Sequence, residues 1–153
     1  MNRILLASTL MLVALAPQAQ QIAMKTENGV QWACGGVGVE ERRAISALAA
    51  QASLFLLLVT EKRGGYLADV EVRLFDRNAS TPRLTINAEG PMCLFRVPAG
   101  HYRIEGTYRG AARRTEADVP AGVAPPLRKV FAFRGEPWDG IWASDEEKRQ
   151  ARE

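Results

Sequence analysis

The sequence predicts a mainly β fold: an antiparallel β-sandwich of about seven strands with one N-terminal amphipathic helix. From Tyr66 onward, short segments of alternating apolar and polar residues are separated by turn residues roughly every 8 to 12 positions. Before Tyr66, residues 39–52 carry apolar side chains at helical spacing instead. The chain therefore combines one helical entry segment with a long series of strands, as expected for a single α+β domain.

The N-terminus has the pattern of an export signal. Arg3 precedes an uncharged, mostly apolar run from Ile4 to Ala16, and small and polar residues follow. A membrane-spanning helix needs about 20 apolar residues, so we predict a signal peptide over residues 1–19, with Ala23 as the alternative cleavage point. No cysteine lies at a plausible cleavage position. We therefore expect a periplasmic protein that is neither a lipoprotein nor stably inserted in the membrane.

The composition of the remainder predicts one domain at residues 29–134, between an irregular leader (20–28) and a polar C-terminal tail (135–153). The 20 basic and 17 acidic residues of the whole chain are interspersed and give a net charge of +3. A nucleic-acid surface would need a clustered basic stripe, which the sequence lacks. We therefore expect no nucleic-acid partner.

The entry segment is predicted to contain a strand, a helix and a second strand. Residues 29–33 alternate weakly and suggest a first or edge strand. The helix over 39–52 begins with two glutamates, which suit the positive end of the helix dipole. The continuous apolar run 53–60 predicts a strand buried on both faces. The apolar face of the predicted helix 39–52 comprises Ile45, Leu48, Ala49 and Ala52.

The later strands are bounded by Gly, Pro, Asn and Ser residues. We place Leu67, Val70, Val72 and Leu74 on the inward side, which requires a bulge near Ala68-Asp69. Tyr102, Ile104 and Tyr108 are inward candidates farther along the chain. The predicted strands are 67–76, 83–88, 92–97, 101–110, 112–119 and 127–133.

Three stretches carry a resemblance to a known family: "ADVEVRLFD" from Ala68, "VPAGHYRIEGTYRG" from Val97 and "VFAF" from Val130. With Gly90-Pro91, they make residues 67–133 resemble the carboxypeptidase regulatory-like, transthyretin-like β-sandwich. The upstream "GGVGVEERR" is similar to the start of small exported proteobacterial proteins in which a helix precedes this sandwich. Such sandwiches serve as spacers, binding modules and accessory domains, so the resemblance implies a fold and no particular activity.

The P-x-G-x-Y turn is the sharpest element of this resemblance. Pro98 fixes φ before the turn, Gly100 is expected to supply a positive φ, and Tyr102 is expected to fill the core after it. The family often has Asp-x-x-Gly after the first sandwich strand, whereas this chain has "DRNAS". That departure affects one turn and leaves the strand pattern intact.

The two cysteines, Cys34 and Cys93, both lie in the part expected to be exported, where oxidation is permitted. A bridge between them would close a loop of about 60 residues and contribute roughly 4 kcal/mol in the chain-entropy model. The alternative is two free buried thiols. We favour the disulfide, and the presence of both cysteines where the family has polar and apolar residues adds to that interpretation.

The glycine-rich stretch before the helix is the first candidate for chemistry. Gly36 and Gly38 match two positions of the dinucleotide fingerprint G-x-G-x-x-G, but the third position is Glu41. Adjacent glutamates at a helix N-terminus would repel a phosphate. We therefore predict that Gly35, Gly36 and Gly38 form a structural strand-to-helix turn, with no cofactor bound.

Catalytic and metal-binding patterns are sparse. His101, the single histidine, is expected to be an exposed turn residue, and one histidine with two distant cysteines does not form a zinc site. The carboxylate pairs Asp69-Glu71 and Glu116-Asp118 could share a strand face, but solvated strands carry such pairs routinely. We predict no metal site and no enzyme activity.

A cluster near the C-terminus completes the candidates. Pro137, Trp138 and Trp142 either cap one end of the core or form an exposed aromatic patch for a partner. Loops 76–82 and 120–126 are further candidate contact regions. Taken together, the sequence favours a non-enzymatic binding module of the cell envelope, whose partner is another envelope protein, a peptide or a glycan. An envelope hydrolase or its inhibitor, and a structural adaptor, are the alternatives.

Overall fold

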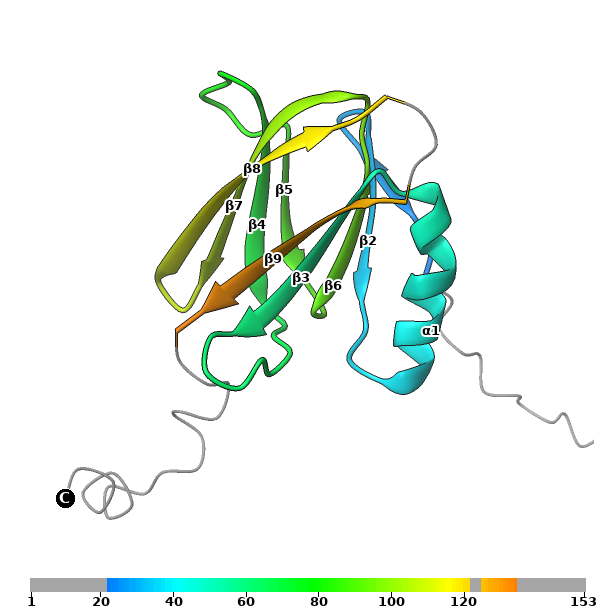
Figure 1. Ribbon diagram of the computed structural model, residues 1–153, viewed down its shortest axis with the longest axis vertical. Helices are drawn as coiled ribbons and strands as arrows, with labels where there is room; N and C mark the ends of the chain where they lie inside the picture. Colours follow the sequence, from blue (N-terminus) through cyan, green and yellow to red (C-terminus); the bar gives the residue numbers. More distant parts are fainter. Residues whose placement is uncertain (1–21, 122–124, 135–153) are drawn as a thin grey trace, which may run out of the picture.

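The computed structural model describes residues 22–121 and 125–134, which form two β-sheets and one short α-helix. Sheet A has the strand order β1-β2-β6-β3-β9, and sheet B has the order β5-β4-β7-β8 (Figure 1). The mainly β prediction is confirmed. The strands are β1 (Lys25–Glu27), β2 (Val30–Gly35), β3 (Leu54–Thr60), β4 (Val70–Asp76), β5 (Leu84–Ala88), β6 (Met92–Arg96), β7 (Gly100–Tyr108), β8 (Ala111–Val119) and β9 (Leu127–Phe133).

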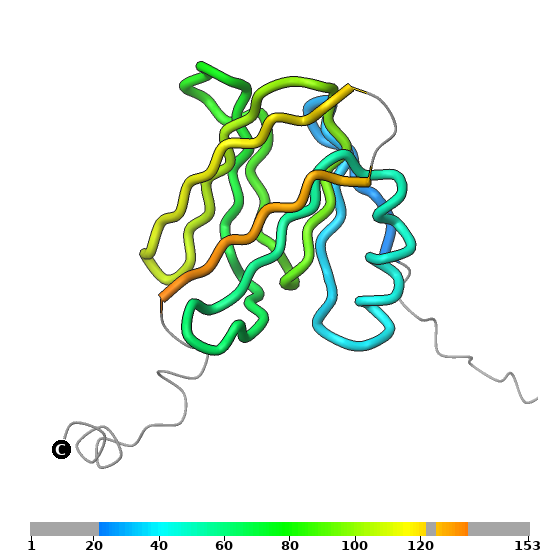
Figure 2. Tube along the Cα trace, in the orientation of Figure 1, coloured from blue at the N-terminus to red at the C-terminus, as the bar shows by residue number. Residues whose placement is uncertain are grey.

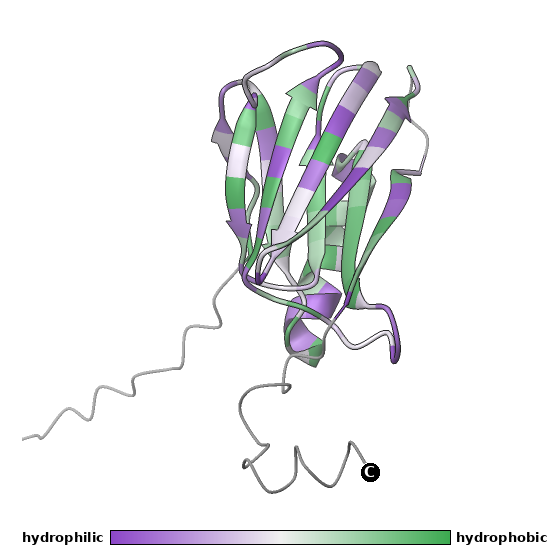
Figure 3. Cartoon of the chain, turned by 90° about the vertical axis from the view of Figure 1, so that its left-hand side faces the viewer, coloured by the Kyte–Doolittle hydropathy of each residue, from purple (hydrophilic) through white to green (hydrophobic). Residues whose placement is uncertain are grey.

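The main core lies between the two sheets. Alternate residues of every strand except β1 contribute to it, because successive side chains of a strand point to opposite faces. Figure 3 shows the resulting bands of hydrophobic and hydrophilic residues along the strands. All the residues placed inward from the sequence are in this core: Leu67, Val70, Val72, Leu74, Tyr102, Ile104 and Tyr108.

The N-terminal leader, predicted to be irregular, contains a strand. β1 pairs antiparallel with β2, and Lys25 lies opposite Trp32. The two residues between the strands, Asn28 and Gly29, have φ angles of 48° and 76°. Two successive positive φ values are typical of the type I′ turn, which matches the twist of a hairpin and favours Asn-Gly. The leader prediction is therefore wrong for residues 25–27.

The entry unit of strand, helix and strand is present, with one strand inserted. β2 and β3 both pair antiparallel with β6, so they run parallel to each other on either side of it. The connection between them contains α1 (Val39–Leu48) and a short 3-10 helix (Ala49–Gln51), within the range predicted for a helix. α1 packs on the outer face of sheet A, where a second apolar cluster comprises Ala33, Ile45, Ala52, Phe55 and Leu94.

The chain passes from sheet A to sheet B between Tyr66 and Val70. The amide of Leu67 donates to Leu58 O in sheet A, and the amide of Asp69 donates to Ala88 O in sheet B. Asp69 has a φ of 57°. The irregularity expected near Ala68-Asp69 is thus a corner between the sheets, and the strand begins at Val70 rather than inside a bulge.

β9 brings the chain back to sheet A, parallel to β3. The two strands lie side by side along their whole length, from Leu54 opposite Leu127 to Thr60 opposite Phe133 (Figure 2). The expectation of a wholly antiparallel fold is therefore wrong for this pair. A parallel pair requires a long crossover, and here the chain between β3 and β9 forms β4 and β5 of sheet B, β6 of sheet A, and then β7 and β8 of sheet B.

The turn before β7 buries its tyrosine. Tyr102 is 4% exposed, and its hydroxyl donates to Pro98 O at 2.9 Å. Burial raises the pKa of Tyr102, Arg83 nearby lowers it, and Asp76 raises it. Gly100 has the expected positive φ, 158°, a backbone conformation that residues with a side chain rarely adopt.

Several predictions fall outside the described residues. These are the signal peptide at 1–19, the whole tail at 135–153 with Pro137, Trp138 and Trp142, and the centre of the loop 120–126. Among the residues that are described, no helix is long and apolar enough to cross a bilayer.

Candidate functional site

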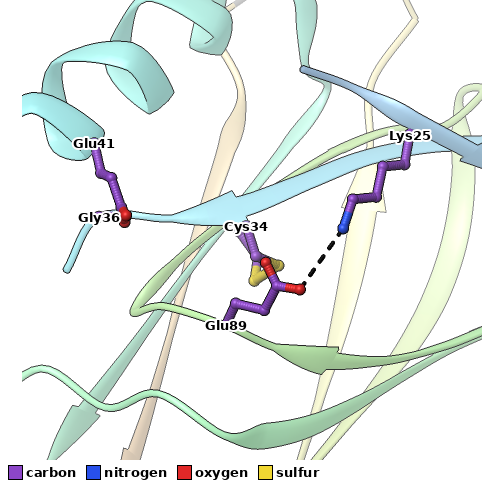
Figure 4. Close-up of a disulfide and its surroundings, with 6 residues drawn as sticks. Lys25, Cys34, Gly36, Glu41 and Glu89 are labelled. Carbon is purple, nitrogen blue, oxygen red and sulfur yellow. Dashed lines mark hydrogen bonds and ion pairs between the residues drawn. A yellow bond between two sulfur atoms is a disulfide. The ribbon is translucent and has the colours of Figure 1, made fainter. Parts of the chain in front are cut away.

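The glycine-rich stretch is closed by its own side chains. The Glu41 carboxylate accepts hydrogen bonds from the amides of Gly36 at 3.0 Å and Val37 at 3.1 Å. The Arg42 guanidinium donates to the carbonyl oxygens of the same two residues, at 3.4 and 3.3 Å. Figure 4 shows Glu41 reaching from the helix to Gly36. Because a carboxylate already occupies these amides, the stretch has no free anion-binding amides at this point.

Only part of this stretch is a turn. Gly35 is the last residue of β2, Gly36 has a φ of 99°, and Gly38 is the N-cap of α1 without a side-chain cap. Gly90 is needed for packing against Gly35: a β-carbon on Gly90 would lie 2.5 Å from Gly35 C and O. The backbones of the β5–β6 turn and of β2 therefore touch directly.

The Cys34–Cys93 disulfide is confirmed. The two cysteines are direct partners in the β2–β6 ladder, with Cα atoms 4.2 Å apart. Cys34 is 9% exposed and Cys93 is fully buried, and both belong to the core between the sheets. A buried disulfide between paired strands has the environment of a structural bridge rather than of a redox site.

His101 lies in β7, opposite Asp118 of β8, and its Nδ1 pairs with the Asp118 carboxylate. The side chains are 50% and 77% exposed. The electrostatic interactions of catalytic acid–base pairs are stronger where water is excluded. The His101–Asp118 pair lies on an exposed strand surface, so it lacks that environment.

The paired carboxylates have basic or amide neighbours. Glu116 pairs with Arg114 at 3.1 Å, and Glu71 pairs with Arg73 at 3.4 Å. Asp69, at the corner before β4, accepts from Asn87 at 3.5 Å. In the described ranges 22–121 and 125–134, no three His, Cys, Asp or Glu side chains gather in a way that could hold a metal ion.

The outer face of sheet B is a mixture of charges that largely neutralise one another. Glu105 pairs with Arg73 at 3.3 Å and with Arg103 at 3.1 Å. Arg103 also covers Phe75, with its guanidinium carbon 4.0 Å from the ring centroid, and donates to Ala79 O in the candidate loop 76–82. This face therefore offers neither an apolar surface nor a charge of one sign.

The outer face of sheet A differs, because the helix covers only part of it. Phe55 lies beneath the helix, and Leu57 and Val59 follow it at two-residue spacing, so they share its face. Leu57 lies between Met92 of β6 and Val130 of β9, and Val59 lies between Tyr66 and Ala132. We call this surface the open face: Leu57, Val59, Tyr66, Met92, Val130 and Ala132.

The open face contains exposed apolar side chains. Val130 is 59% exposed and Tyr66 is 54% exposed, and the other four members are partly buried. Val37, 64% exposed, follows Gly36, where an added β-carbon would lie 2.9 Å from Met92 Sδ. Four large hydrophobic residues in the described parts of the chain are exposed, and these include Val130, Tyr66 and Val37.

Basic residues border the open face. The Arg128 guanidinium carbon lies 4.4 Å from the Phe55 ring centroid, at the boundary with the helix. Lys62 and Arg63 are exposed in the turn that joins β3 to Tyr66. Arg134 follows β9, is 87% exposed and lies 3.5 Å from Glu61. The surface thus combines an apolar centre with a mainly positive border.

The open face is not identified in the sequence analysis, because the continuous apolar run 53–60 predicts a strand buried on both sides. A signal was available in β9, where Phe131 and Phe133 point to the core while Val130 and Ala132 occupy the alternate positions. Apolar residues at both alternations of an edge strand indicate a second apolar surface.

In comparisons with known proteins, no family model, no curated protein and no solved structure matches this chain.

Proposed function

We propose that this protein is a non-enzymatic binding module whose contact surface is the open face. The observation that carries the proposal is the exposure of Val130 and Tyr66 on a sheet surface of which the other half is covered by α1. A contiguous apolar surface with a polar border is the usual form of a protein contact site. The partner class that fits is a protein segment with apolar side chains flanked by acidic residues.

The face suits this role better than the sheet edge does. A structural adaptor would offer the backbone of edge strand β9 to a strand of its partner. Ala132 O of β9 already accepts from Arg113 Nε at 2.8 Å, and Arg113 is held in turn by an ion pair with Glu61. The end of this edge is therefore occupied by a side chain of β8, which favours recognition through side chains.

Photo-crosslinking tests this proposal directly. The photoreactive residue p-benzoylphenylalanine replaces Val130 in one full-length variant and Thr85 in the other. Thr85 is the matched control, because it is an exposed strand position on sheet B. In envelope extracts, we expect a discrete, identifiable adduct from position 130 that is absent from position 85 and weakened by Tyr66→Ala. Equal adducts from both positions would contradict the proposal.

We further propose a transthyretin-like arrangement of the sheets and a periplasmic location after signal cleavage. Ile22 bears on the cleavage point: a β-carbon on Gly35 would lie 2.7 Å from Ile22 Cδ1, and Ile22 packs against the second apolar cluster. Cleavage after Ala23 would remove this contact, whereas cleavage after Ala19 keeps it. N-terminal sequencing of the exported protein should therefore begin at Gln20, and a start at Met24 would refute this reasoning.

A further inference from the structure

We propose that the open face is the docking site of the chain's own C-terminal segment, residues 135–147, with which an external partner would compete. This inference rests on the proposed function, because it names an occupant for the same surface. The full-length protein would then present the open face only when the segment is displaced.

The connection of the chain places the segment within reach. β9 is the edge strand of the open face, and it ends at Phe133, one residue before Arg134. An extended chain advances about 3.3 Å per residue, so Trp138 can lie up to roughly 16 Å from Phe133. Val130 lies about 10 Å back along the same strand. Gly135 and Pro137 are residue types that favour the reversal this path requires.

The apolar residues of the segment match the surface. Trp138, Ile141 and Trp142 are its large apolar side chains. A tryptophan can bury about 150–250 Å² and usually provides much of the binding energy of a small interface. Val130 and Tyr66 provide exposed apolar area for such side chains.

The charges are also complementary. Residues 135–147 contain no Lys or Arg, and their acidic residues are Glu136, Asp139, Asp145, Glu146 and Glu147. The border of the open face contains Lys62, Arg63, Arg128 and Arg134, with Glu61 as its acidic member. Opposite charges around an apolar centre favour one partner over others and fix its register. Basic residues return at Lys148 and Arg149, which sets the end of the proposed segment.

Tryptophan quenching in the full-length chain tests the docking. The variant Trp138→Phe/Trp142→Phe retains only Trp32, which is 9% exposed, and so supplies the background signal. After this correction, we expect acrylamide quenching constants at least threefold lower than those of a synthetic peptide 135–153. Val130→Glu should raise them to the peptide value, whereas the control Thr85→Glu should leave them low. Peptide-like quenching in the unsubstituted chain would overturn the inference.

Two further measurements separate the possible occupants. Light scattering should find a monomer, and a dimer that Val130→Glu dissociates would show instead that the face binds a second copy. If the segment competes with the partner, Trp138→Ala/Trp142→Ala should increase the adduct from position 130 at least twofold. An unchanged partner adduct together with peptide-like quenching would refute the inference and leave the proposed function standing. Protected tryptophans without any partner adduct would do the reverse.

Discussion

Removing the disulfide should lower the free energy of unfolding by about 4 kcal/mol. Cys34 and Cys93 are separated by 59 positions in the sequence, and the chain-entropy model assigns about 4 kcal/mol to a loop of that size. The change is Cys34→Ala/Cys93→Ala. Because the two residues are already direct partners in the β2–β6 ladder, alanines at these positions leave the strand register unchanged. The effect is therefore expected mainly in the unfolded state.

Urea unfolding followed by circular dichroism measures this effect. The unfolded chain without the bridge is less compact and exposes more surface, so the denaturant slope m should increase while the midpoint falls. The unsubstituted protein with its bridge reduced is the control, and it should lose a similar amount. A loss below about 1 kcal/mol with unchanged m would refute the reasoning, because it would mean that the unfolded chain gains no freedom when the bridge is removed.

Three substitutions test local features of the fold. Glu41→Ala should lower the free energy of unfolding in urea by about 1–2 kcal/mol, because two loop amides lose their acceptor. The control Glu40→Ala, at the exposed neighbouring position, should lower it by less than about 0.5 kcal/mol. Equal losses would contradict the role of Glu41. Gly106→Ala should lower thermal stability by about 1–3 kcal/mol, because its β-carbon would lie 2.7 Å from Phe131 Cδ2; an unchanged melting temperature would disprove this contact. Burial raises the pKa of Tyr102, so the folded state favours the neutral phenol, and stability should fall as pH rises from about 10 through the folded-state pKa. Tyr102→Phe should lack this alkaline decline and cost about 1 kcal/mol at neutral pH, and an identical decline in both proteins would assign it to other groups.

The local patterns of the chain predicted its elements better than its sheet order. The helix and the inward residues of β4 and β7 follow from periodicity, and the strand within 53–60 follows from a continuous apolar run, both of which depend only on neighbouring residues. The parallel pairing of β3 with β9 joins segments about 70 residues apart, and no local pattern specifies it. The number of cysteines favours a disulfide between Cys34 and Cys93. It does not predict that the two residues are direct partners in the ladder of β2 and β6.

The missed hairpin shows that a short local signal can outweigh a weak periodicity. Residues 25–27 have no alternating apolar pattern, because all three are exposed in an edge strand. The Asn28-Gly29 dipeptide favours the type I′ turn of a two-residue hairpin, and it is the local signal in the sequence for β1. The irregularity near Ala68-Asp69 is at the predicted position, but it is a corner between the sheets and not a bulge. A positive φ such as that of Asp69 fits either structure.

The size of α1 explains why the functional candidate is a sheet surface. A helix of 10 residues is about 15 Å long and about 10 Å wide, whereas five strands spaced about 4.8 Å apart span roughly 19 Å between the outer strand axes. α1 packs over β2 and β6, so the far half of β3 and all of β9 lie beyond its width. An apolar run such as 53–60 predicts that other elements pack on both faces of the strand. The sequence does not predict how many strands the helix on the outer face covers. Because α1 is narrower than sheet A, part of the outer face of the sheet stays uncovered. This uncovered part is the open face, which a second element or a partner can bury.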